Sequence, residues 1–168
     1  MKKLFTLLFT LVFIYSCDES SSVVLQTNSD FGASFPVQIP KTDGTPATYN
    51  EMISQNLNQI ISNFDNVKSL TITALSYQFL DVSGNTNAVI QNASFKINGI
   101  DITTFPDLNP TEVQENIYTI ENQSILNQIK ASFLSSDTVS VEYTAEVLSD
   151  EGPVNFTVFV GIGVNVVF

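Results

Sequence analysis

The stretch TVSVEYTAEVL, from Thr138 to Leu148, decides the fold class. Its apolar side chains occupy every second position and polar ones lie between them, which is the period of a strand with one buried face. The turn-forming run Asp150-Glu151-Gly152-Pro153 comes next, and residues 154–168 then form a second long apolar segment. Two long strands separated by a short turn predict an antiparallel hairpin at the end of the chain.

The same alternation occurs in residues 31–39, which predicts another half-buried strand. In residues 69–81 the apolar phase switches after Ala74, which indicates a bulge or a strand buried on both faces. The dipeptide Asn98-Gly99 favours a type I′ turn and predicts a tight hairpin. The remaining predicted strands are residues 23–25, 88–98, 100–104 and 117–120.

Two segments predict amphipathic helices. Thr48 and Glu51 match a capping box, in which each side chain accepts a hydrogen bond from an otherwise unpaired helical N–H. The apolar residues behind them recur at spacings of three and four, so a helix is predicted over residues 49–64. A shorter helix is predicted over residues 124–134. Their inward residues are Ile53, Leu57, Ile60, Ile61 and Phe64 in the first, and Ile125, Leu126, Ile129 and Phe133 in the second.

These elements predict an α+β protein that is mostly β, an antiparallel β-sandwich with two short amphipathic helices at an edge or end. Residues 23–168 contain no linker-like stretch and are predicted to form a single β-rich domain. The segments beginning at Asn58 and Asn127 resemble each other at a constant offset, and a predicted hairpin follows each. This likeness has two interpretations, a duplicated α-β-β unit or chance.

The N-terminal residues resemble a targeting signal. Lys2 and Lys3 precede the apolar residues 4–15, a run too short for the ~20 residues of a membrane-spanning helix. Residues 1–16 therefore read as a secretory signal peptide. The sequence Ile14-Tyr15-Ser16-Cys17 resembles a relaxed bacterial lipobox, which implies that the sulfur of Cys17 carries a diacylglycerol. The alternative is a secreted protein with a free thiol, since a single cysteine allows no internal disulfide.

Residues 17–22 are predicted to comprise the lipidated cysteine and a short flexible tether of serines. Asp18 and Glu19 resemble the acidic export signal that sends lipoproteins to the outer face of the outer membrane. Solvated linker charges are the alternative interpretation. With the leader, this start is similar to small Bacteroidota (flavobacterial) lipoproteins, and the resemblance implies a lipid-anchored protein of the outer membrane, displayed on the cell surface.

Composition excludes several kinds of chemistry. The chain carries a net charge of −11, and removal of Lys2 and Lys3 leaves 4 lysines against 17 acidic residues, a net of −13. Such a domain repels phosphate backbones, so no nucleic-acid partner is predicted. The chain has no His, Arg or Trp. A Ser-His-Asp triad, a His-ligated metal and a bidentate anion clamp are therefore excluded.

Acidic and amide residues provide weak candidate sites. Glu142 and Glu146 share a strand face but lie roughly 13 Å apart, beyond the ~5 to 9.5 Å of paired catalytic carboxylates. Asp81, Asn85 and Asn87 form an oxygen-rich loop with the ligand chemistry of calcium. An ordinary polar loop is the favoured interpretation, so no metal or cofactor is predicted. Asp150 and Glu151, in the other turn, are a weaker calcium candidate.

Glycine and phenylalanine provide two further candidates. Gly161 and Gly163 fall on one face of the last strand beside Phe159, where a ligand or another backbone can approach closely. A helix packed across the sheet is the favoured explanation of these glycines. The phenylalanines admit two interpretations, the lining of a lipid cavity or the packing of a core, and core packing is favoured. They are Phe31, Phe35, Phe79, Phe95, Phe105, Phe156, Phe159 and Phe168.

The sequence predicts a non-enzymatic envelope lipoprotein that binds a protein or glycan partner. The prediction rests on the anchor at Cys17 and on the missing catalytic residue types. A carrier of small apolar ligands, with a cavity between sheets and helices, is the second possibility. A hydrolase that uses only carboxylates ranks third.

Overall fold

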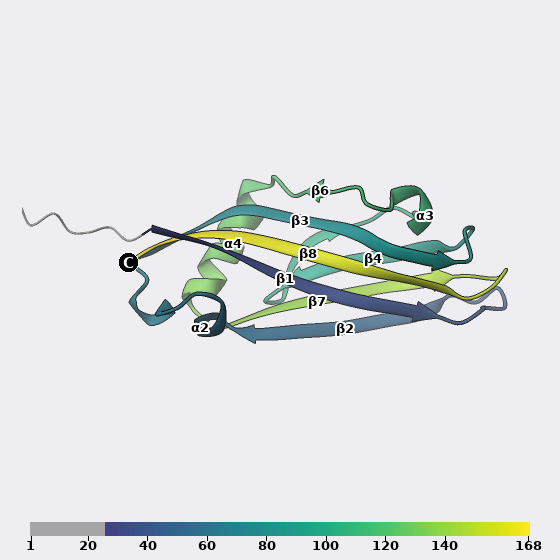
Figure 1. The fold of residues 1–168 in the computed structure, drawn as a ribbon, viewed down its shortest axis with the longest axis horizontal. Helices are drawn as coiled ribbons and strands as arrows, with labels where there is room; N and C mark the ends of the chain where they lie inside the picture. The colour runs from purple at the N-terminus through teal and green to yellow at the C-terminus, as the bar shows by residue number, and fades with distance from the viewer. Residues whose placement is uncertain (1–25) are drawn as a thin grey trace, which may run out of the picture.

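The computed structural model describes residues 26–168, which form two four-stranded antiparallel sheets packed face to face (Figure 1). The mostly-β antiparallel sandwich predicted from the sequence is thereby confirmed. Sheet A has the strand order β1 (Gln26–Ile39), β8 (Val154–Val167), β3 (Ser69–Gly84) and β6 (Tyr118–Thr119). Sheet B has the order β2 (Ala47–Asn56), β7 (Thr138–Leu148), β4 (Val89–Ile97) and β5 (Ile100–Thr104).

The N-terminal predictions lie outside the described residues. They are the signal peptide 1–16, the lipidated Cys17, the export residues Asp18 and Glu19, the tether, and the strand 23–25. From Gln26 to the end of the chain, no helix has the length and apolar character needed to cross a membrane.

The helix predicted over residues 49–64 is wrong. Residues 47–56 instead form the edge strand β2, which pairs with β7 from Ala47 to Asn56. Thr, Tyr, Asn and Ile are poor helix formers, and the ladder with β7 satisfies the backbone groups that the capping box was expected to serve. Helix survives only as the single turn α2 (Leu57–Ile60), capped by Asn56, and the 3-10 turn η1 (Phe64–Asn66).

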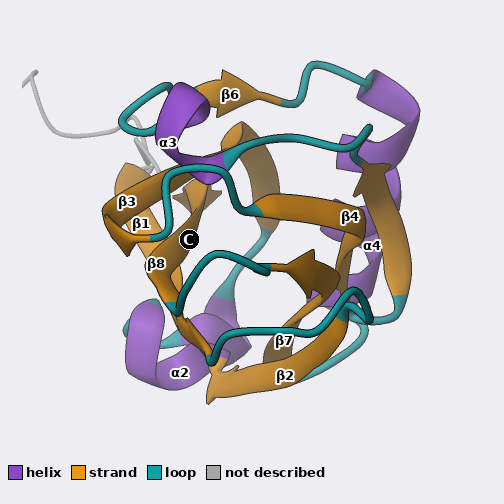
Figure 2. Cartoon of the chain, turned by 90° about the vertical axis from the view of Figure 1, so that its right-hand side faces the viewer, coloured by secondary structure: helices purple, strands orange, loops and turns teal. Residues whose placement is uncertain are grey.

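The second predicted helix is confirmed as α4 (Gln123–Leu134). Asn122 caps it, because its side-chain oxygen accepts hydrogen bonds from the backbone N–H groups of Ser124 and Ile125. Ile129 and Phe133 are buried. The helix packs beside β3 and β5, away from α2, which lies beside β1 and β2 (Figure 2). The short helix α3 (Pro110–Val113) was not predicted.

The two long predicted hairpins are not hairpins. β3 and β4 belong to different sheets, as do β7 and β8, so each turn carries the chain from one sheet to the other. Since the first predicted helix is mostly strand, the structure does not contain a repeated unit of one helix followed by one hairpin. β4 and β5 do form the predicted tight hairpin, with positive φ angles of 49° at Asn98 and 77° at Gly99.

The bulge predicted in β3 is confirmed. The pairing of β3 with β8 shifts register between Ile72 and Ala74, which is the place where the apolar phase switches. A second shift occurs between Leu80 and Ser83. The bulge turns Leu75 inward and keeps Ser76 on the outer face of sheet A, so it sets the phase of the strand beside the candidate site.

The core lies between the sheets and consists of the inward-facing residues of the long strands. Aromatic rings from both sheets meet there, including Phe35 against Tyr143 with ring centroids 5.9 Å apart and Phe79 against Phe156 at 6.1 Å. Burial of this apolar surface is the main force that holds the sheets together. Core packing, the favoured interpretation of the phenylalanines, describes Phe31, Phe35, Phe79, Phe95, Phe105 and Phe156, which are buried.

Candidate functional site

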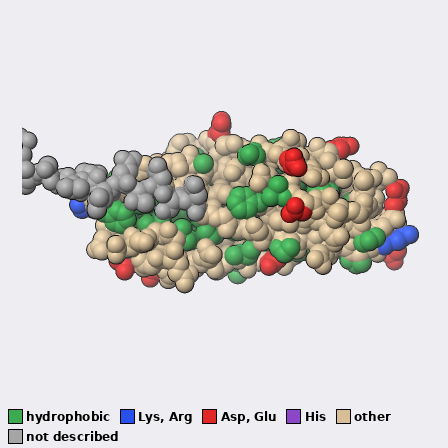
Figure 3. Space-filling model, in the orientation of Figure 1, with side chains coloured by type: hydrophobic (Ala, Val, Ile, Leu, Met, Phe, Trp, Pro, Cys, Tyr) green, Lys and Arg blue, Asp and Glu red, His purple; other side chains and the backbone are tan. Residues whose placement is uncertain are grey.

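The outer face of sheet A, called the outer A face below, is formed by alternate residues of β1, β8 and β3. The side chains of β1 are described from Phe31 onward, and Asp30 stands opposite Gly163 in the ladder. The described outward-facing side chains are uncharged over three ranges of these strands. The ranges are Gly32 to Gln38 in β1, Ser69 to Leu80 in β3 and Asn155 to Val167 in β8. Figure 3 views the molecule from this side: uncharged polar groups and backbone make up most of the described surface, with apolar side chains and a few Asp and Glu side chains among them.

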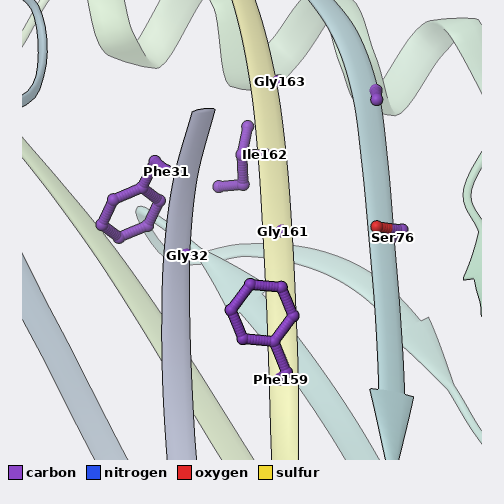
Figure 4. Close-up of a pocket in the computed structure, with 8 residues that line it drawn as sticks. Phe31, Gly32, Ser76, Phe159, Gly161, Ile162 and Gly163 are labelled. Carbon is purple, nitrogen blue, oxygen red and sulfur yellow. The ribbon is translucent and has the colours of Figure 1, made fainter. Parts of the chain in front are cut away.

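A flat aromatic ring lies on glycine in the middle of this face. Gly32 of β1 and Ser76 of β3 stand opposite Gly161 of β8. Phe159, two residues before Gly161, bends its ring over this row. A Cβ atom at Gly32 would lie 2.6 Å from the Cε2 and Cζ atoms of Phe159, and one at Gly161 would lie 3.3 Å from Cε1. Figure 4 shows the ring face-on in front of β8, with β1 on one side of it and β3 on the other.

A shallow hollow of about 480 Å³ opens beside the ring. The volume lies within the roughly 300 to 1,000 Å³ of small-molecule sites. Ala74, Gly161 and Gly163 provide its small residues, and Phe159 and Ser76 border it. The hollow lies outside the sandwich, on the outer A face.

Within residues 26–168, no helix packs across Gly161, so the favoured explanation does not hold for this glycine. The atoms that a Cβ at Gly161 would meet belong to Phe159 and Ser76, and the hollow is lined by β1, β3 and β8 alone. Gly161 instead makes room for Phe159, an aromatic side chain of its own strand. Sequence reasoning noticed Phe159, Gly161 and Gly163 but missed Gly32 and Ser76, which only the strand register brings beside them.

The outer face of sheet B, called the outer B face, is charged and internally bonded. Asn92 donates to the carboxylate of Glu146 at 2.7 Å, and the hydroxyls of Ser94 and Thr144 lie 2.7 Å apart. Lys96 pairs with Asp101 at 3.4 Å. On the outer A face, by contrast, no side chain takes part in a hydrogen bond with another described residue. The polar side chains of this face thus have hydrogen-bonding capacity that the other described side chains do not use. They are Ser34, Gln38, Ser69, Thr71, Ser76, Gln78, Asn155, Thr157 and Asn165.

The carboxylate pair predicted as a weak catalytic candidate lies on the outer B face. Glu142 stands opposite Lys96 in the ladder, and Glu146 stands opposite Gln91. With Asn92 bonded to Glu146, both carboxylates belong to a row of cross-strand polar neighbours.

The calcium candidates lie in the loops at one end of the sandwich, where Asn85 and Asn87 tie two turns together. The amide of Asn85 donates to the Ser149 hydroxyl at 3.0 Å, and that of Asn87 donates to Glu151 at 2.7 Å. Asp81 adopts a positive φ of 54° at the irregular end of β3. Within residues 26–168, no three acidic, cysteine or histidine side chains are grouped as metal ligands.

The same end holds Asp150, whose carboxylate accepts hydrogen bonds from the Thr42 hydroxyl at 2.6 Å and the Gly44 N–H at 2.8 Å. These bonds lower the pKa of Asp150, with the Thr42 bond the larger cause. The carboxylate thus acts as a clamp on the loop between β1 and β2.

The other described side chains with a shifted pKa are three tyrosines. Burial raises the pKa of Tyr143, whose hydroxyl is enclosed without a hydrogen-bond partner. Burial and then a hydrogen bond to Glu51 raise the pKa of Tyr49. Burial, reinforced by nearby Tyr118, raises the pKa of Tyr77 to about 12. All three phenols stay protonated at neutral pH, so none of them supplies a base there.

Known proteins give this chain no family and only a distant structural likeness. No family model and no curated protein matches this chain. Among solved structures, it is similar to the BFDV capsid protein, known from a crystal structure of its decamer. The likeness has 8% identity and a TM-score of 0.40, and it covers 84% of this chain and 99% of the capsid chain. A likeness at this level carries no inference about function.

Proposed function

We propose that the protein is a non-enzymatic lipoprotein of the bacterial cell surface, anchored through Cys17, and that it binds a partner through the outer A face. The anchor is inferred from the lipobox-like sequence before Cys17. Attached acyl chains would hold the domain at the membrane, since two or more chains anchor stably. The acidic residues at positions 18 and 19 favour display on the outer membrane.

One observation carries the binding proposal: among the described residues, the polar side chains of the outer A face are not bonded to one another, whereas several on the outer B face are. A polar surface that is internally satisfied has little to offer a partner, because its hydrogen bonds would have to be exchanged. The ring of Phe159 adds an apolar anchor in the middle of the unsatisfied surface. Aromatic residues are among the side chains that most often carry binding energy.

Matched lysine variants test the proposal. Ser34→Lys places a charge on an exposed position of β1 on the outer A face, and Ser54→Lys does the same on β2 of the outer B face. The tagged full chain, displayed in its native envelope, is recovered with its bound material. We expect the bound material to be lost with Ser34→Lys and kept with Ser54→Lys. Equal recovery from both variants would place the binding surface elsewhere.

The anchor is tested separately by labelling cells with radioactive palmitate. We expect label in the wild-type chain and none in Cys17→Ala. An unlabelled wild-type chain released into the medium would refute the proposed location.

A further inference from the structure

The outer A face also indicates what kind of ligand it takes, an inference that rests on the binding function proposed above. The chain carries a net charge of −11, yet the described side chains of this face are uncharged. The surrounding acidic surface repels polyanions. Figure 3 shows a few Asp and Glu side chains on this side of the molecule, and the exposed Asp81 lies at the end of β3. The residues that line the hollow beside Phe159 include no carboxylate and no lysine. The surroundings of Phe159 therefore suit an uncharged ligand.

The ring of Phe159 provides a stacking platform. The glycine row at Gly32 and Gly161 supports the ring from beneath, since any side chain at Gly32 would occupy the position of the ring. The opposite side of the ring is turned away from the sheet, as Figure 4 shows. A pyranose sugar has a face made of C–H groups, and such a face packs well against the negative face of an aromatic ring.

Side chains that donate and accept hydrogen bonds surround the platform. In the ladder, Ser34 and Gln78 stand on either side of Phe159, and Ser76 stands opposite Gly161. Hydroxyl and amide groups can both donate and accept, as sugar hydroxyls do. A lipid chain would leave these groups unbonded, which costs free energy.

A protein partner fits the face less well than a sugar. Stable protein interfaces bury about 800 Å² on each side, with a core richer in apolar and aromatic residues than the rest of the surface. The described outer A face has one aromatic ring, in a setting mostly of Ser, Thr, Asn, Gln and Gly, and its other apolar side chains are the scattered Pro36, Ala74, Leu80 and Val167. The same composition argues against a second copy of this chain as the occupant.

We propose that the outer A face binds a neutral saccharide chain. One pyranose ring stacks on Phe159, above the Gly32 and Gly161 row. The hydroxyl groups of this ring and of its neighbours in the saccharide bond to Ser34, Ser76 and Gln78.

Calorimetric titration of the full chain in detergent micelles tests this inference. The probes are neutral hexasaccharides of glucose, mannose and galactose, with an oligogalacturonate of equal length as the acidic comparator. We expect at least one neutral hexasaccharide to bind and the acidic one not to bind. Phe159→Leu keeps apolar bulk but removes the ring, and about a tenfold loss of affinity is expected.

Two further variants separate stacking from a general disturbance of the fold. Phe159→Trp keeps an aromatic face and is expected to bind at least as tightly as the wild type. Met52→Leu changes an exposed apolar residue on the outer B face and is expected to have no effect. Thermal unfolding of each variant shows whether a change in affinity accompanies a change in stability.

The outcomes distinguish this inference from the proposed function. If no neutral hexasaccharide binds, the saccharide inference fails, while the loss of bound material in Ser34→Lys still decides whether the face binds a partner. Equal affinity of Phe159→Leu and the wild type overturns the stacking site. Dimers that dissociate on dilution and vanish in Ser34→Lys would assign the face to a second copy of the chain and overturn the inference.

Discussion

The two outer faces of this sandwich are built on the same core but have opposite surfaces. On the outer B face, hydroxyl, amide and charged side chains pair across β7, β4 and β5. On the outer A face, side chains of the same polar kinds remain unpaired among the described residues, and glycines hold an aromatic ring flat against the sheet. Cross-strand pairs stabilise a sheet. A sheet that does without them keeps its polar groups for other contacts.

The contrast between the two sheets lies on their outer faces, so a large core side chain should contribute about equally to stability on either inner face. Phe35 of sheet A is fully buried, and Phe95 of sheet B is nearly so. Phe35→Ala and Phe95→Ala should each lower the free energy of unfolding by about 3 to 5 kcal/mol, because each removes a large core side chain and leaves a cavity. Urea titration measures both. A loss below ~1 kcal/mol in one variant alone would mean that the two sheets do not share a single core.

The buried hydroxyl of Tyr143 sharpens the comparison, because it is an unpaired polar group on the inner face of sheet B. Tyr143→Phe removes the hydroxyl and keeps the ring against Phe35 and Phe95. We expect unfolding to require about 1 to 2 kcal/mol more, since a buried polar group without a partner carries a desolvation cost. A loss of stability on urea titration would show that the hydroxyl has a partner in solution.

The glycine support of Phe159 is tested by Gly32→Ala, whose new Cβ would lie 2.6 Å from the ring. The ring must shift, and we expect a loss of about 1 kcal/mol, at the low end of overpacking. Gly152→Ala is the matched control, since nothing lies within 4 Å of a Cβ there.

A double-mutant cycle shows whether the ring causes this loss. In the Phe159→Ala background, Gly32→Ala should have almost no cost, because the two residues are in contact. The same cost in both backgrounds would mean that the ring does not rest on Gly32.

The smallest expected effect tests the hydrogen bonding of the faces directly. Ser94 and Ser76 are both half-buried, but only Ser94 has a cross-strand partner. Ser94→Ala should lower the free energy of unfolding by about 0.5 to 1 kcal/mol through loss of the bond to Thr144. Ser76→Ala should change it by less than ~0.5 kcal/mol. Equal losses by chemical denaturation would remove the difference between the faces.

Local patterns predicted most of the strands. Strict alternation in residues 31–39 and 138–148 depends only on which side chains face the core, and the Asn98-Gly99 turn depends on two residues that tolerate positive φ. The helix at residues 49–64 failed because its capping and spacing signals are local. The pairing of Ala47–Asn56 with β7 comes from the distant part of the chain.

The candidate site could be predicted only in part for the same reason. The spacing of Phe159, Gly161 and Gly163 places them on one face of a single strand. Gly32 and Ser76 reach them through the registers of β1 and β3 against β8, and the β3 register includes a bulge. Which turns cross between sheets also decides which strands become neighbours, and the turn sequences do not specify this.

The central claim is that the partner binds the outer A face, and photo-crosslinking in intact cells tests it most directly. A photoreactive amino acid replaces Ser34 on the outer A face in one strain and Ser54 on the outer B face in another. The account predicts crosslinked material of higher mass from position 34 and none from position 54. Crosslinks from position 54 alone would contradict it.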